Sequence, residues 1–474
     1  MPGRPLSRIQ CTKIRKCVEG QYNKAYVLTM SNGDEVVARL PNPNAGPEFY
    51  TTASEVATRD FVRGILKIPV PRILASSSDA TNAVGAEYII EEKAPGRPLG
   101  DIWAQMPTPA RLGIIDQLVD VEKKLASVSF PKHGCIYYAS DLETRPSSAS
   151  EMDSVEPFPG FAIGPSNDRK LWQSGRDQMR LGRGPCETHI ILLIAHLTSP
   201  GTSLLEYAVA IGENELQWAE AHAAPRINPH RSMEEPETPA QYIHLLQQYL
   251  KIVPYLVSGL HDSSSRNTLF HPDLHLDNIF IDPATNKITS IIDWQSAATT
   301  PFPLQPSHPQ MLELSVNPSS DEQRKQEKEL LEYYYAKTNA AGLHRAPSGD
   351  PSLRVRLNPL THITGCWERH DTFSLRQSLI SVVAHWDTLY PDGTIPCPIT
   401  FTRGDLQAHK LESELISGLA GIIRQLDEHI PMGGMVRAAQ YESARAVSEF
   451  FKKEFVELGE DEEKRKLHEA VWPY

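Results

Sequence analysis

The chain has 474 residues, more than one hydrophobic core usually organises, so we expect two lobes or domains. Its net charge of -12 argues against nucleic acid or anionic lipid as the main binding partner. The longest apolar runs are much shorter than the roughly twenty residues of a membrane helix, and no secretory signal opens the sequence. Six scattered cysteines without metal-ligand spacing favour a reduced, intracellular and soluble setting.

The N-terminal part is typical of an antiparallel meander. Three predicted strands cover Thr12 to Val18, Lys24 to Met30 and Glu35 to Leu40. Asn32-Gly33 suits a type I′ hairpin turn before the third strand. The turn before the second strand, Glu19 to Asn23, contains one glycine and by itself indicates only an ordinary hairpin loop.

A helix and two further strands complete this region. Apolar residues at helical spacing predict a helix over Thr52 to Ile65, and strands are expected over Ile68 to Ala75 and Ala86 to Ile90. Glu91 to Lys93, followed by Ala94-Pro95-Gly96, resembles a hinge. We therefore divide the chain at this point, into residues 1–93 and residues 94–474.

The remainder of the chain is predicted to be mainly helical. We expect a surface loop over Asp141 to Pro157 and a linker over Pro225 to Pro236. Amphipathic spacing predicts helices over Pro109 to Val128, Glu206 to Ala223, Pro239 to Leu260, Asp321 to Thr338, Thr372 to Tyr390, Leu406 to Ile430 and Tyr441 to Leu458.

The most specific chemistry lies between Leu269 and Thr299. Two apolar runs flank a turn-forming segment, which predicts a hairpin, with Asp273 and Asn278 before its first strand and Asp293 directly after its second. Phosphoryl transfer requires a carboxylate to orient and deprotonate a hydroxyl group, and oxygen ligands to hold magnesium on the nucleotide phosphates. These three residues could supply both functions.

This stretch resembles the aminoglycoside phosphotransferase branch of the kinase-like fold. The match is carried by His271, Asp273, Asn278 and the string Ile291-Ile292-Asp293. Trp294 stands where protein kinases have phenylalanine, and no glycine follows, which favours small-molecule kinases. The resemblance implies an α+β, bilobal protein-kinase-like fold, with a small antiparallel sheet lobe and a larger, mainly helical lobe. It also implies that residues 1–93 are the nucleotide-binding lobe and residues 94–474 the catalytic and substrate lobe with a helical extension.

The resemblance also implies roles for individual residues. Asp273 is the expected catalytic residue, Asn278 and Asp293 are the expected Mg²⁺ ligands, and His271 and His275 are expected to fix the loop. Arg39 stands where the family usually has lysine, and Glu55 is expected to hold it in place. The residues expected to contact ATP are Gly20, Asn23, Arg39, Glu55, Glu91 and Lys93, the last two through backbone groups at the adenine edge.

Each of these roles has a structural alternative. Arg39 could be a solvated strand residue, and Glu55 could be a glutamate that merely suits the dipole of its helix. The single glycine of the first turn and the arginine at position 39 keep open a nucleotide-binding pseudokinase or a mitochondrial maintenance factor without transfer activity. A purely structural interaction protein is a third class.

A more specific resemblance is to a fungal group of this family, named for altered inheritance of mitochondria. It rests on Phe161 to Trp172, Cys397 to Phe401 and Trp472 to Tyr474, and it implies a mitochondrial location. An apolar run at Cys186 to Ser203 departs from that pattern. We predict an ATP- and Mg²⁺-dependent phosphotransferase that acts on a small-molecule hydroxyl group, with acceptor and oligomeric state undetermined.

Overall fold

A computed structural model describes residues 10–17, 20–143, 153–155, 158–183, 203–258, 266–315, 318, 320–343, 351–426, 430, 436 and 440–474. The chain divides into two compact units. The first comprises Met1–Ala210, Val257–Leu314 and Ser320–Asp350, and the second comprises Ile211–Leu256, Ser315–Ser319 and Pro351–Tyr474. These units differ from the predicted lobes, residues 1–93 and 94–474, and that lobe boundary stays a prediction.

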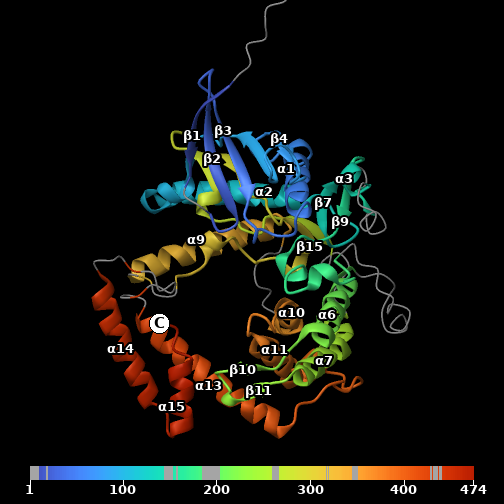
Figure 1. The fold of residues 1–474 in the computed structure, drawn as a ribbon, viewed down its shortest axis with the longest axis vertical. Helices are drawn as coiled ribbons and strands as arrows, with labels where there is room; N and C mark the ends of the chain where they lie inside the picture. The colour runs from blue at the N-terminus through green and yellow to red at the C-terminus, as the bar shows by residue number, and fades with distance from the viewer. Residues whose placement is uncertain are drawn as a thin grey trace, which may run out of the picture. The chain divides into compact units, whose positions relative to one another are not determined.

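The N-terminal sheet is antiparallel and has the strand order β1-β2-β3-β5-β4 (Figure 1). The strands are β1 (Cys11–Lys16), β2 (Asn23–Met30), β3 (Glu35–Pro41), β4 (Ile73–Ser77) and β5 (Tyr88–Glu92). The β2–β3 turn lies at the Asn-Gly pair, and Gly33 has a φ of 89°. The predicted type I′ geometry is wrong, because Asn32 does not have a positive φ and the turn is closed by hydrogen bonds from Gly33 to Met30 and from Met30 to Asp34. The expected strand over Ile68 to Ala75 begins only at Ile73, because Pro69 and Pro71 interrupt the ladder.

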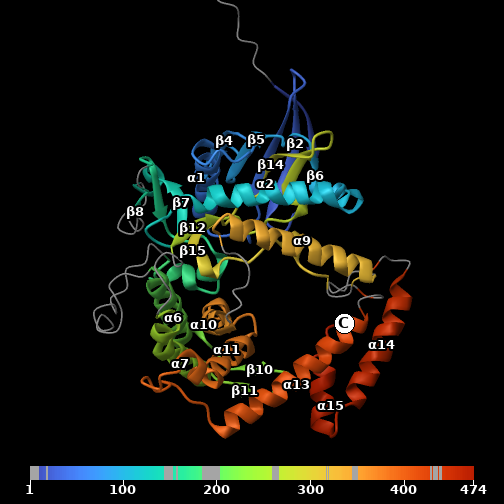
Figure 2. The same ribbon diagram turned by 180° about the vertical axis from the view of Figure 1, so that it is seen from behind.

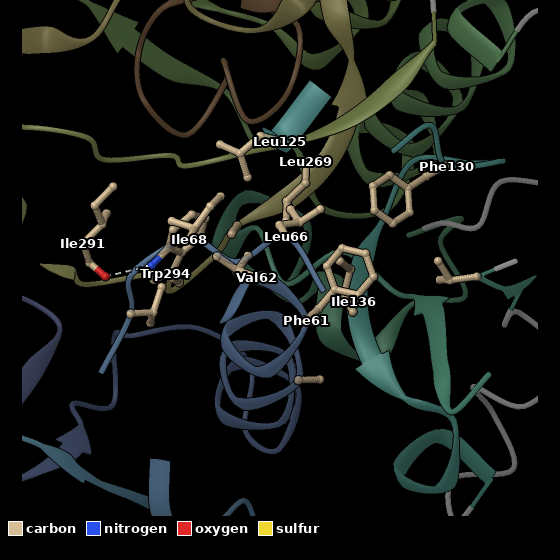
Figure 3. Close-up of a cluster of buried hydrophobic side chains, with 14 of the residues drawn as sticks. Phe61, Val62, Leu66, Ile68, Leu125, Phe130, Ile136, Leu269, Ile291 and Trp294 are labelled. Carbon is tan, nitrogen blue, oxygen red and sulfur yellow. Dashed lines mark hydrogen bonds between the residues drawn. The ribbon is translucent and has the colours of Figure 1, made fainter. Parts of the chain in front are cut away.

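Helix α1 (Tyr50–Gly64) joins this sheet to the rest of the first unit through a shared core (Figure 3). Phe61 and Val62 of α1 are fully buried in the same cluster as Leu269, Ile291 and Trp294. The indole Nε1–H of Trp294 donates a hydrogen bond of 3.1 Å to the carbonyl oxygen of Ile291. The core thus packs α1 against the predicted catalytic stretch.

The rest of the first unit consists of small sheets and long helices. Strands β13 and β14 form the predicted hairpin, and β13 also pairs with β6. Helices α2 and α9 pack together (Figure 2). The Tyr333 hydroxyl group of α9 donates a hydrogen bond to Asp116 of α2. The elements are β6 (Arg97–Pro98), α2 (Thr108–Ala126), β7 (Cys135–Tyr138), α3 (Ala139–Glu143), β8 (Asp153–Ser154), β9 (Phe161–Gly164), β12 (Asn267–Phe270), β13 (Ile279–Asp282), β14 (Lys287–Ile291), β15 (Ala298–Pro301) and α9 (Asp321–Ala340).

The second unit is mainly helical. Its centre contains the buried carboxylates of Glu237 and Glu412, with Arg376 paired to both. Its elements are most of α6 (Ser203–His222), β10 (Arg226–Asn228), β11 (Ser232–Glu237), α7 (Pro239–Val257), α10 (Pro351–His362), α11 (Thr372–Ala384), α12 (Trp386–Leu389), α13 (Arg403–Leu426), α14 (Tyr441–Glu457) and α15 (Glu462–Ala470).

Two predicted loops are wrong. The expected linker at Pro225 to Pro236 contains the β10–β11 hairpin, because Asn228 donates to buried Glu237 and Glu412 and so ties this polar segment into the second unit. In the expected surface loop Asp141 to Pro157, Leu142 is buried in α3 and β8 pairs with β9. Residues 144–152 of that loop, and all of Cys186 to Ser203 except its last residue, lie outside the described residues.

The predicted α+β class is confirmed, since an antiparallel N-terminal sheet precedes a mainly helical remainder. Helix α10 was not predicted, because Pro359 lies inside it and its apolar spacing is poor. No helix in the described part of the chain combines the length and the apolar character that crossing a membrane requires.

Gly96 offers a test of how the hinge segment is attached to the hairpin. A Cβ atom at Gly96 would collide with the carbonyl oxygen of Ile281, and its φ is 94°. We expect Gly96→Ala to lower the free energy of unfolding by about 1–3 kcal/mol because of this strain. Gly113→Ala, in the open flank of α2, should instead raise it by roughly 0.5–1 kcal/mol. Equal effects in urea unfolding would contradict this packing.

His133 predicts a pH dependence of stability. Its Nδ1 lies 2.8 Å from the carbonyl oxygen of Thr299, and burial lowers its pKa from 6.5 to about 4. The unfolded chain therefore binds this proton first, so the stabilisation is complete above pH 6.5 and is lost as the pH falls towards 4. Urea unfolding should show a larger loss between pH 7.5 and 5 for the native chain than for His133→Asn, and identical losses would refute this.

Candidate functional site

The buried side chain of His271 supports the loop between β12 and β13. This side chain is 7% exposed and lies edge-on against Trp294, with ring centroids 4.6 Å apart. Its Nε2 lies 2.9 Å from the carbonyl oxygen of Ile292, while Nδ1 accepts a 3.2 Å hydrogen bond from the Asp273 backbone. Burial lowers the pKa of His271, so the neutral ring acts as a structural brace for the loop.

Asp273 and Asn278 lie together at the two ends of this loop. The amide Nδ2 of Asn278 donates a 2.9 Å hydrogen bond to the carbonyl oxygen of Asp273, and Asn278 is buried. The Asp273 side chain is 57% exposed, with its Oδ2 at 3.5 Å from Nε2 of His275. Because the Asn278 amide nitrogen is used inside the loop, its Oδ1 is the atom that could accept an outside partner.

Asp293 follows β14 with a backbone φ of 62°, a conformation that Asp tolerates better than most residues. The preceding residue, Ile292, donates a 2.9 Å backbone hydrogen bond to the carbonyl oxygen of Asn278. This bond joins the two ends of the hairpin. The structure therefore brings Asp273, Asn278 and Asp293 to one end of it, as the sequence predicts.

Arg39 connects this end of the hairpin to the N-terminal sheet and to α1. Its Nη2 lies 2.8 Å from Oδ1 of Asp293, and its Nη1 forms an ion pair with Oε1 of Glu55. Burial opposes the charge of Arg39, but the carboxylates of Glu55, Asp293 and Glu91 raise its pKa overall. Arg39 is therefore not a solvated strand residue, and Glu55 is not merely a dipole partner of its helix.

The turn between β1 and β2 contacts the segment after Asp293. Nδ2 of Asn23 donates a 2.6 Å hydrogen bond to Gln295, whose own amide donates 2.9 Å to the carbonyl oxygen of Ala45. Gly20 lies in the same turn, with its carbonyl oxygen 3.4 Å from Nδ2 of Asn42. Gln295 was not predicted, and its only signal is a polar side chain two residues after Asp293.

Glu91 and Lys93 do not join the Arg39 cluster directly. Glu91 lies within β5 between β3 and β4, and its buried carboxylate pairs with Arg59 of α1. The Lys93 side chain is exposed and pairs with Glu35. Backbone outside the sheet begins after Glu92, so the predicted contacts to an adenine edge would fall at Lys93 and beyond, and they stay a prediction.

The Phe161 to Trp172 motif contacts the β1–β2 turn and the start of α1. The guanidinium carbon of Arg169 lies 3.9 Å from the ring centroid of Tyr22, and the Trp172 ring lies 4.9 Å from that of Tyr50. Asp168 caps the following turn by accepting from the Lys170 backbone. These contacts favour an anchoring role for the motif.

A pocket of about 260 Å³ opens beside Asp273 within the first unit. Its walls come from α2, the Asp273 loop and the segment after β15. Three carboxylates, from Asp273, Glu122 and Glu313, line it together with polar groups of Gln305 and His308. The carboxylates favour cationic over anionic molecules, and the rest of the lining is largely apolar.

Asn278 and Asp293 alone supply only part of a coordination shell for Mg²⁺. Among the residues that the structure describes, no three His, Cys, Asp or Glu side chains gather as a metal site. The Asp293 carboxylate, 36% exposed, and the Asn278 amide oxygen are the hard oxygen donors that Mg²⁺ prefers. Such a site would need phosphate oxygens to complete it, which is how Mg²⁺ usually binds with nucleotides.

The sequence matches a known protein family over the region that contains this site. The model described as the phosphotransferase enzyme family covers residues 13–302, which is more than half of the chain. The chain therefore belongs to the phosphotransferase enzyme family. The matched range includes Arg39, Glu55 and the whole β12 to β15 region, so it spans both parts of the site.

Several known proteins resemble the chain. A subtelomeric hrmA-associated cluster protein of Aspergillus fumigatus is 32% identical, over 89% of this chain and 88% of its own length. The mitochondrial altered inheritance of mitochondria protein 9 of Candida tropicalis is 25% identical, over 87% and 72%. The ADP-bound aminoglycoside phosphotransferase APH(2'')-Ib matches 78% of this chain and 93% of its own, with 10% identity and a TM-score of 0.38, too low to bear on function.

The buried ion pairs around Glu55 predict a large effect of removing it. We expect Glu55→Ala to lower the free energy of unfolding by roughly 3–5 kcal/mol, because Arg39 and Arg59 would keep buried charge with fewer partners. Glu92→Ala removes the exposed pair with Arg72, whose side chains are 42% and 62% exposed, and serves as the control. Glu92→Ala should lower the free energy of unfolding by less than about 1 kcal/mol. Similar losses of stability in the two variants would contradict the buried ion pairs of Glu55.

Proposed function

We propose that this protein is an ATP- and Mg²⁺-dependent phosphotransferase that acts on the hydroxyl group of a small molecule. The observation that carries the proposal is the Arg39 bridge. One guanidinium group from the N-terminal sheet contacts Glu55 of α1 and Asp293 at the end of the hairpin, 2.8 Å away in the latter case. Membership of the phosphotransferase family gives this arrangement its chemical interpretation.

Asp273 would act on the acceptor. Its carboxylate is 57% exposed and faces the 260 Å³ pocket, so a hydroxyl group bound there could donate its hydrogen bond to this carboxylate. The carboxylate would orient the hydroxyl oxygen and receive its proton as the new oxygen–phosphorus bond forms, while the bond between the γ-phosphorus and the bridging oxygen of ATP breaks and ADP leaves. Hydrogen bonds of the Asp273 backbone to the side chains of His271, which accepts, and Asn278, which donates, hold the loop that presents this carboxylate.

The guanidinium group of Arg39 would contact the nucleotide phosphates, while Glu55 remains paired with its Nη1. A guanidinium group binds phosphate oxygens in a forked geometry, which differs from the single point charge of lysine. Asn278 and Asp293 would hold Mg²⁺, which supplies charge neutralisation to the phosphates when it is bound. Asn23 and Gly20, in the turn fastened to Gln295, would cover the same phosphates.

The alternative is a nucleotide-binding pseudokinase or maintenance factor without transfer activity. It is motivated by the arginine at position 39, where the family usually has lysine, and by the single glycine, Gly20, of the β1–β2 turn. A protein of this class would bind nucleotide and still yield no Asp273-dependent product. A mitochondrial location, in turn, is a proposal that rests on the names of relatives such as the Candida tropicalis protein.

Substitution of Asp273 tests the proposal. With γ-labelled ATP, Mg²⁺ and a panel of amino alcohols, sugars and aminoglycosides, Asp273→Asn should lower product formation by about 10²–10⁴-fold, because it removes the base. The control Asp277→Asn, in the same loop and exposed, should keep the native rate. No product from the native chain, or product that is equal in both variants, would refute transfer by Asp273.

Calorimetry with ADP separates nucleotide binding from transfer. Asp293→Ala should lose the Mg²⁺-dependent part of ADP binding while its thermal unfolding remains cooperative, because a metal ligand is removed and the core is not touched. Asp273→Asn should retain ADP binding. Equal ADP affinity of Asp293→Ala and the native chain in the presence of Mg²⁺ would contradict the metal assignment.

A further inference from the structure

Arg169, in the Phe161 to Trp172 motif, carries a charge that no carboxylate balances. Its guanidinium carbon lies 3.9 Å from the ring centroid of Tyr22, in the β1–β2 turn. Within the part of the chain that the structure describes, this guanidinium group forms no hydrogen bond and no ion pair. The adjacent carboxylate, that of Asp168, accepts from the Lys170 backbone instead. The contact with the ring therefore holds the guanidinium group on the turn and leaves its N–H donors available to a ligand.

The Arg39 bridge, in contrast, has no positive charge to spare. Glu55 and Asp293 both contact the Arg39 guanidinium group, so two carboxylates stand against one cation. A nucleotide that keeps negative charge after it has bound Mg²⁺ requires a further cation near its phosphates. Arg169 is such a cation, and it is already in place beside the turn that contains Gly20.

Strand β3 sets the order of the predicted nucleotide contacts. The Lys93 side chain pairs with Glu35 at the start of β3, and the contacts to adenine are predicted at the Lys93 backbone and beyond. Arg39 lies further along the same strand. A nucleotide with its adenine at Lys93 would therefore extend its phosphates towards Arg39 and the end of β3.

The end of β3 lies beside the turn that carries Arg169. Pro41, the last residue of the strand, is paired with Asn23, and Tyr22 immediately precedes Asn23. Tyr22 and the guanidinium group on its ring thus lie beyond Arg39, at the end of the strand away from the predicted adenine contacts. Of the three phosphates of ATP, the terminal one would lie nearest to Arg169.

We propose that Arg169 binds the terminal phosphate of MgATP and that Tyr22 is its positioning residue. This inference rests on the proposed function and adds a second guanidinium group to the phosphate site. Arg39 contacts the phosphates nearer the adenine, and Arg169 contacts the phosphate that is transferred. Because ADP lacks that phosphate, the contribution of Arg169 is specific to the triphosphate.

Calorimetry of the full chain with Mg²⁺ and either ADP or non-hydrolysable β,γ-imido-ATP tests this assignment. Arg169→Gln should weaken binding of β,γ-imido-ATP at least about tenfold, or 1.4 kcal/mol, and change ADP affinity by less than about twofold. Arg169→Lys keeps the charge without the fork, so it should recover part of the loss. The control Arg180→Gln, at an exposed arginine that follows the motif, should leave both affinities unchanged.

Two variants of Tyr22 test its positioning role. Tyr22→Leu removes the ring beneath Arg169 and should weaken binding of β,γ-imido-ATP by about two- to fivefold, because a cation–π contact of this kind is lost. Its ADP affinity should stay at the native value. Tyr22→Phe keeps the ring and should bind both nucleotides as the native chain does.

Each result decides between the assignment and a merely structural role. Equal weakening of both nucleotides by Arg169→Gln would show that Arg169 only supports the turn, and native affinity for β,γ-imido-ATP would also overturn the assignment. If the native chain binds neither nucleotide, the proposed function fails and takes this inference with it. Thermal unfolding establishes that each variant is folded, and Arg169→Lys keeps the test valid if Arg169→Gln is not.

Discussion

The site depends on one interaction, the contact of Arg39 with two carboxylates that are distant in the sequence. Glu55 comes from α1 and Asp293 from the end of the hairpin, and the guanidinium group reaches both because it is forked. A lysine could offer only a single point charge at this position. The core beneath the bridge, in which Phe61 packs in one cluster with Leu269 and Trp294, holds these elements together.

This bridge also explains why arginine at position 39 is compatible with a phosphotransferase. Burial alone would oppose the charge, but three carboxylates, those of Glu55, Asp293 and Glu91, raise the pKa of Arg39 overall. The positive charge is therefore maintained at the place where the phosphates would bind. Glu91 raises the pKa of Arg39 without contacting it. The Glu91 carboxylate is itself paired with Arg59 of α1.

The local parts of this architecture could be predicted from the sequence. The β13–β14 hairpin follows from two apolar runs around a turn, and the position of the β2–β3 turn, but not its type, follows from the Asn-Gly pair. The convergence of Asp273, Asn278 and Asp293 could be predicted because the hairpin itself brings its two ends together. The pairing of Arg39 with Glu55 was expected from the family resemblance, and the side-chain contact is present.

The parts that could not be predicted depend on long-range contacts. The β10–β11 hairpin has a polar sequence with a proline, and contacts with distant residues such as Glu412 and Arg376 show why it is ordered. Gln295 closes the turn over the site through bonds to Asn23 and Ala45, which are more than two hundred residues away in the chain. Neither contact leaves a periodic signal in the sequence.

The central claim is that Arg39, held by Glu55, contacts the phosphates of a nucleotide whose Mg²⁺ is held by Asn278 and Asp293. A structure of the protein with Mg²⁺ and a non-hydrolysable ATP analogue tests it most directly. The account predicts that Asp293 and Asn278 contact the metal through oxygen, that Arg39 contacts phosphate, and that Glu55 still holds Arg39. A metal bound without Asp293 and Asn278, or a nucleotide bound away from Arg39, would contradict it.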